Sequence, residues 1–151
     1  MSASAVTFAV VLPALLVAHN VADHWVQTSH QAACKGQRGH AGRKACAAHV
    51  ASYTAVTALV VGLVWLVFGL DVSPVGFVVG QLVSALTHYW ADRRFTLAAL
   101  ARLTGHTRFY VLGTPRTGRD DNPSLGTGAY ALDQAWHWLW LFVAALLTAV
   151  L

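Results

Sequence analysis

Three segments of the chain carry a histidine and an aspartate four residues apart. The pairs are His19 and Asp23, His88 and Asp92, and Asp133 and His137. Residues four apart on an α-helix lie on one face, about one turn apart. A lone histidine, His49, stands near the start of another apolar segment. Imidazole and carboxylate groups on four segments predict a metal site between facing helices.

The composition indicates an integral membrane protein of one domain. Of the 151 residues, 56% are hydrophobic and 11% are charged, whereas soluble domains average about 25% charged residues. The mean hydropathy is +0.53. The net charge of +4 is spread over segments that flank the apolar runs. This distribution favours contact with anionic lipid headgroups and argues against a nucleic-acid partner.

Four apolar segments are long enough to span a bilayer, which takes about 20 residues. They cover approximately 5–27, 46–70, 74–100 and 129–151. We predict an all-α fold, a polytopic membrane four-helix bundle with up-down-up-down topology. The segments 18–23 and 87–92 share His, Ala and Asp at equivalent positions. This short repeat suggests two helical hairpins related by a pseudo-twofold axis.

The basic residues predict the orientation. All ten Lys and Arg residues lie between Lys35 and Lys44 or between Arg93 and Arg119. By the positive-inside rule, loops 28–45 and 105–128 are cytoplasmic and both termini are outside. The seven His and Asp residues then share one layer near the cytoplasmic surface. Since ionisable groups at membrane depth are usually functional, this layer favours a metal centre.

The number of candidate ligands exceeds what one tetrahedral ion needs. Two ions, or one ion with a carboxylate base at Asp23 or Asp92, would fit. Zinc suits the ligand set best, and manganese or iron is compatible. Three alternatives stay open: polar groups that only hold the helices together, a haem, or a zinc site in the first loop. The haem would use His19, His49, His88 and His137, and the loop zinc site would use His30, Cys34, Cys46 and His49.

The pattern resembles a known family. The matching elements are His-x-x-x-Asp-x-x-x-Gln at 19–27, the lone His49, His-x-x-x-Asp at 88–92 and Leu-Asp-Gln-x-x-His at 132–137. They are similar to small polytopic membrane proteins of bacteria and their phages that are known only as a domain of unknown function. Residues 126–134 resemble the actinobacterial and actinophage members. More distantly, the chain is similar to putative metal-dependent hydrolases of the bacterial inner membrane. The resemblance implies the fold, the metal ligands and a location in the bacterial inner membrane.

Two functions of different kinds are consistent with these residues. The first is a metal-dependent hydrolase that acts on a lipid or headgroup at the cytoplasmic leaflet. Four arginines could then hold an anionic headgroup: Arg93, Arg94, Arg116 and Arg119. The second is a non-enzymatic protein with a structural metal, which transports metal or protons or alters the envelope by contact with other membrane proteins. A homo-oligomer is compatible with either function.

Overall fold

The computed structural model describes residues 2–115 and 126–151, and this part of the chain is helical with no strand. The all-α prediction is therefore confirmed. The elements are α1 Ala3–Val21, the π-helical turn η1 Ala22–Val26, α2 Ser29–Cys34, α3 His40–Phe68, α4 Pro74–Asp92, α5 Phe95–Leu103, α6 Thr107–Tyr110 and α7 Gly128–Val150.

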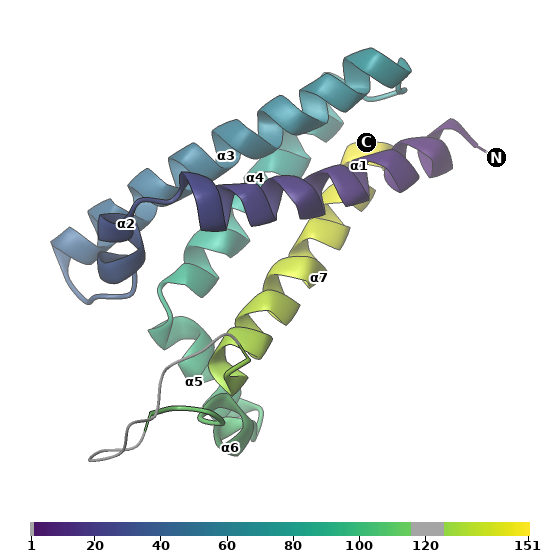
Figure 1. The fold of residues 1–151 in the computed structure, drawn as a ribbon. Coiled ribbons are helices and arrows are strands. Elements are labelled where there is room, and N and C mark those ends of the chain that lie inside the picture. Colours follow the sequence, from purple (N-terminus) through teal and green to yellow (C-terminus); the bar gives the residue numbers. More distant parts are fainter. Residues whose placement is uncertain (1, 116–125) are drawn as a thin grey trace.

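Four long helices pack in a closed order. Helix α1 contacts α3 and α7, and α4 contacts the same two helices. Both termini lie at one end of the molecule, while α2, α5 and α6 lie at the other end (Figure 1). The seven α-helices of the described residues do not clearly form the predicted four-helix bundle, because three shorter helices pack around one end of the long ones.

Polar caps explain where several helices begin. The Ser73 hydroxyl accepts a hydrogen bond from the Gly76 N–H, and Pro74 is the first residue of α4. Proline suits this position because the first turn of a helix needs no donor there. The Thr127 hydroxyl caps α7 in the same way, by accepting from the Tyr130 N–H.

The third predicted segment is wrong as a continuous helix over 74–100. Helix α4 ends at Asp92 and α5 begins at Phe95. Arg94 between them has a φ of 55°, which costs a residue with a Cβ about 1 kcal/mol or more. The break persists because Arg93 and Arg94 are held by carbonyl groups of the segment that precedes α3.

The two predicted loops also contain helices. In the loop predicted over 28–45, α2 occupies Ser29–Cys34 and α3 begins at His40. In the loop predicted over 105–128, α6 occupies Thr107–Tyr110. Arg116 and Arg119, two of the candidate headgroup ligands, lie outside the described residues.

Two helices of the described chain are long and apolar enough to cross a membrane, Ala3–Val26 and His40–Phe68. Helices α4 and α7 approach each other closely. A Cβ at Gly80 of α4 would lie 2.1 Å from Thr148 Oγ1 of α7, so only glycine fits there. Close contact through small residues is typical of helices packed in lipid.

Candidate metal centre

All seven predicted ligands come together at the inner surfaces of the long helices. They form three overlapping groups, and within each group the potential ligand atoms lie within 4.8 Å of one another. The groups are His19 with Asp23 and His88, His49 with His88 and Asp92, and Asp92 with Asp133 and His137. His88 and Asp92 of α4 each belong to two groups, so α4 is the central helix of the cluster.

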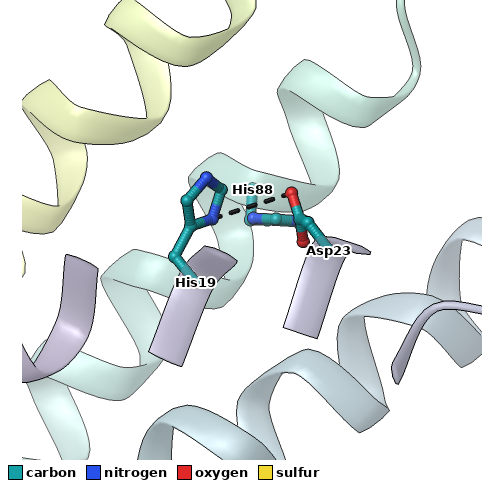
Figure 2. A group of neighbouring side chains, drawn as sticks. All are labelled: His19, Asp23 and His88. Atoms are coloured by element: carbon teal, nitrogen blue, oxygen red, sulfur yellow. Dashed lines mark ion pairs between the residues drawn. The ribbon is translucent and has the colours of Figure 1, made fainter. Parts of the chain in front are cut away.

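A π-helical turn presents Asp23. Helix α1 changes to η1 at Ala22, and the Gln27 N–H donates to the Ala22 carbonyl at 2.9 Å. Such turns are rare, and those that do occur are frequently found at functional sites. Asp23 Oδ2 lies 3.7 Å from His19 Nδ1, and both side chains point toward His88 of α4 (Figure 2).

Four ligand atoms converge at the centre of the cluster. The Nε2 atoms of His49 and His88 are 3.1 Å apart. Asp23 Oδ1 lies 3.3 Å from His49 Nε2 and 3.4 Å from His88 Nε2. Asp92 Oδ2 lies 3.2 Å from each of the same two nitrogens. The four atoms come from η1, α3 and α4.

Five of the six separations among these four atoms are close to those around a small tetrahedral ion. Zinc binds nitrogen and oxygen at about 2.0 Å, so ligand atoms at the corners of a regular tetrahedron lie about 3.3 Å apart. The five separations above fall between 3.1 and 3.4 Å. Two imidazoles and two carboxylates are also an ordinary ligand set for zinc, manganese or iron(II).

Asp133 and His137 bring α7 to the cluster. His137 Nδ1 lies 2.8 Å from the backbone carbonyl of Asp133, and it donates there because a carbonyl only accepts. This bond leaves His137 Nε2 with a lone pair, as in many metal-binding histidines. The imidazole stacks on that of His19, with ring centroids 4.9 Å apart.

Several buried atoms of the cluster have no hydrogen-bond partner in the described part of the chain. They include both ring nitrogens of His19, Asp23 Oδ1, Asp92 Oδ2 and His137 Nε2. Buried polar atoms are normally satisfied, and each exception needs an explanation. Asp23 Oδ1 and Asp92 Oδ2 do face the imidazole nitrogens of His49 and His88 at 3.2–3.4 Å. All of these atoms are available to bind an ion.

The other two predicted centres do not fit. The imidazoles pack directly on one another. The ring centroid of His88 lies 4.4 Å from that of His137 and 5.1 Å from that of His49, so a porphyrin cannot lie between them. The loop zinc site does not assemble, because no metal-binding group of the described residues contains a cysteine. Cys34 and Cys46 are free, and the buried Cys46 thiol points at the Tyr89 carbonyl at 3.7 Å.

Lys35 enters the cluster from the segment between α2 and α3. Its Nζ lies 2.9 Å from Asp92 Oδ1, and the two side chains are 9% and 4% exposed. In the sequence, Lys35 is one of several basic residues of a predicted loop, and this position does not indicate its role. No local pattern distinguishes it, because its position depends on how the whole segment folds back.

Two arginines hold that segment in place. Arg93 is buried and donates to the carbonyls of Lys35 and Gln37 at 3.0 and 2.6 Å, and its guanidinium also lies over the Phe95 ring. Arg94 is exposed and donates to the Ala32 carbonyl at 3.0 Å. The predicted headgroup contacts of both residues stay predictions.

A polar cavity of about 560 Å³ adjoins the cluster. Its lining includes three carboxylates and two cations, Asp23, Asp92, Asp133, Lys35 and Arg94. The cavity therefore joins candidate metal ligands to positive charge. It is large enough to admit a small ligand.

Two tyrosines also line this cavity, Tyr110 of α6 and Tyr130 of α7. Burial and the nearby Asp133 carboxylate raise the pKa of Tyr110. Its phenol therefore stays protonated and can donate a hydrogen bond to an anion in the cavity.

Hydrogen bonds between α3 and α4 support the histidines. The Tyr53 and Ser84 hydroxyls are 2.7 Å apart, and the Tyr53 ring stacks on His88 with centroids 3.9 Å apart. The Thr57 hydroxyl donates to Gln81 Oε1 at 2.8 Å. Gln81 and Ser84 belong to α4, and their partners Thr57 and Tyr53 belong to α3. These contacts fix the orientation of the central imidazole.

The fold and the site define an all-α protein with two membrane-length helices and buried His and Asp groups that could hold a metal ion. The chain belongs to the DUF3307 family, described as a protein of unknown function, which it matches over residues 11–151. The resemblance to a family of unknown function is thus confirmed. No curated protein and no solved structure matches the chain. The more distant likeness to membrane hydrolases stays a prediction.

Proposed function

We propose that the protein is a membrane-embedded, metal-dependent hydrolase that acts on an ester or phosphoester at the cytoplasmic leaflet of the bacterial inner membrane. In this proposal α1 with η1, α3, α4 and α7 form an up-down-up-down four-helix bundle across the bilayer, with both termini outside. Zinc is the expected ion, and manganese or iron is compatible with the same ligands.

The distribution of side chains supports four spanning helices. Helix α4 exposes a stripe of large apolar residues, Val75, Val78, Leu82 and Leu86. Helix α7 does the same with Leu139, Phe142, Leu146 and Val150. The polar residues of both helices, in contrast, include buried ones: Gln81, Ser84, His88, Asp92, His137 and Thr148. A polar interior beneath an apolar surface is typical of helices in lipid.

One observation carries the metal proposal, the set of separations between 3.1 and 3.4 Å among Asp23 Oδ1, His49 Nε2, His88 Nε2 and Asp92 Oδ2. His49, His88 and Asp92 are the best candidates for ligands because all three are buried. Asp23 would be either the fourth ligand or a base beside the ion. Asp92, Asp133 and His137 offer a second three-ligand position, and three protein ligands leave room for water.

The polar cavity supports hydrolysis over a purely structural role. A bound ion would lower the pKa of its water toward about 7 and polarise a carbonyl or phosphoryl oxygen. Asp23 and Asp92 line the cavity, so either carboxylate could accept the proton of that water. Lys35 and Arg94 face the same cavity and could pair with an anionic substrate.

A structural metal is the second candidate function. It is favoured by the four converging protein atoms themselves, because a structural site is closed by four protein ligands whereas a catalytic site keeps a position open. In that case the protein would act by transport or by contact with other membrane proteins, and its ion would hold η1, α3 and α4 together.

Metal content and turnover test the proposal together. Protein purified in detergent should carry near-stoichiometric zinc, manganese or iron, and His88→Ala should lose it because His88 belongs to two of the groups. His40→Ala is the matched control, since His40 is exposed at the start of α3. Acyl-ester and phosphoester lipid analogues should be hydrolysed by the parent protein but not by His88→Ala. Absence of metal in the parent refutes the proposal, and metal without any turnover favours the structural role.

A further inference from the structure

An apolar groove of about 290 Å³ lies between α5 and α7, beside the candidate metal centre. Its lining includes Leu97, Leu100, Leu132, Ala135, Trp136 and Leu139. No part of the polar cluster enters this groove. Its walls therefore suit a hydrocarbon chain and offer little to a polar ligand.

The groove lies beside the polar cavity. Leu97 of α5 lines both spaces. A ligand with a polar end and an apolar chain could thus place its chain in the groove and its polar end in the cavity, with the Leu97 side chain between them. The break between α4 and α5 sets this arrangement, because it turns α5 away from the line of α4 and beside α7.

The aromatic residues near the groove are of a type that is common at membrane surfaces. Trp136 lines the groove, stacks on Trp90 with ring centroids 4.4 Å apart, and donates from Nε1 to the Thr87 carbonyl at 3.2 Å. Tryptophan is enriched at the interface between hydrocarbon and headgroups. A groove at this depth is reached by the upper part of a lipid chain.

Two basic residues and a phenol of the polar cavity could bind the other end of the ligand. Lys35 and Arg94 lie on its wall, and Tyr110 adds a phenol donor. Charge-assisted hydrogen bonds to phosphate are stronger than those to a neutral group. Carboxylates on the same wall would bind the metal ion and would repel an anion without one.

We propose that the α5–α7 groove holds an acyl chain of a lipid phosphate whose phosphate group occupies the polar cavity beside Lys35 and Arg94. This inference rests on the proposed function and names its substrate class. It differs from the metal proposal in the residues that carry it, because none of the groove residues is a candidate ligand.

Photo-crosslinking tests the groove directly, without turnover. The probe is a non-hydrolysable phosphonate analogue of phosphatidic acid with a diazirine on one chain, added to the purified protein in detergent. Crosslinked peptides should come from α5 and the first half of α7. Ala135→Trp should reduce labelling about tenfold, because displacing two buried methylene groups already amounts to that factor. Ala135 is exposed, so the larger side chain fits without disturbing the core.

Ala55→Trp is the matched control, because Ala55 is an exposed alanine in a separate apolar groove between α3 and α4. It should leave labelling unchanged. A neutral probe with a hydroxyl in place of the phosphonate should label about tenfold less, since it loses its charge-assisted contacts. Equal labelling by Ala135→Trp and the parent, labelling that maps to α3 and α4, or equal labelling by the neutral probe overturns the inference.

Metal analysis of the same samples separates the two proposals. Groove labelling by the phosphonate probe in protein that carries no metal would refute the proposed hydrolase, and it would show that the groove holds the lipid phosphate even against the charge of the free carboxylates. Stoichiometric metal with labelling outside the groove would refute the groove and leave the metal centre in place.

Discussion

Replacement of Lys35 by methionine should destabilise the metal-free protein more than the zinc-loaded protein. Methionine keeps the length and volume of the side chain but removes the charge that faces Asp92 Oδ1 at 2.9 Å. The two side chains are 9% and 4% exposed, so water cannot solvate the carboxylate that has lost its partner. Breaking a buried pair by removing one partner costs about 3–5 kcal/mol.

The size of the effect depends on the ion. In chelator, the cost corresponds to a fall in melting temperature of about 6–20 °C, at 2–4 °C per kcal/mol for a chain of this size. In zinc, Asp92 would bind the ion and the loss should be about half as large. By linkage, a difference of about 2 kcal/mol means that Lys35→Met binds zinc about thirtyfold more tightly than the parent.

Thermal unfolding in detergent, followed by circular dichroism with zinc or with chelator, measures both costs. Competition with a fluorescent chelator measures the zinc affinity. Lys44→Met is the matched control, because Lys44 is exposed on α3 and should change neither quantity. A penalty in Lys35→Met that is equal with and without zinc, or a weaker zinc affinity, would refute the electrostatic account of the cluster.

Two further predictions concern the base and the topology. Asp23→Asn should retain metal through His49, His88 and Asp92, but its rate of hydrolysis should fall by about 10²-fold or more. Turnover and metal content are measured in one preparation, and full activity would show that Asp23 is not the base. Cys34 should react with a membrane-impermeant maleimide in inverted vesicles and not in intact cells, whereas the buried Cys46 should react only after unfolding; labelling of Cys34 from outside would reverse the orientation.

The spacing of the candidate ligands predicted that their side chains would lie close together, and this proximity is confirmed. A four-residue interval places His88 and Asp92 on one helix face whatever the rest of the chain does. The apolar residues around each pair then decide which face turns inward. The long apolar segments located the four long helices, although the third was predicted too long.

The ends of the helices were harder to predict. Arg43 and Lys44 were interpreted as loop residues from their charge, but α3 begins at His40 and extends past the apolar segment. Arginine and lysine are good helix formers, so their charge does not mark the end of the helix. The residues around the break at Arg94 include no proline or glycine that would predict it. It depends on hydrogen bonds to residues about 60 positions earlier in the chain, which no local pattern records.

The charge balance of the centre could be judged only with the structure. The sequence supplied three aspartates in one layer, which would repel one another at that depth. The fold adds Lys35 to them, because Arg93 and Arg94 hold the segment that carries it. With neutral imidazoles, three carboxylates and one ammonium group leave two negative charges among Asp23, Asp92 and Asp133. A single divalent cation neutralises that charge, and a buried charge needs such a partner to be stable. Lys35 thus favours one ion over two, since a second divalent ion would give the centre a net positive charge.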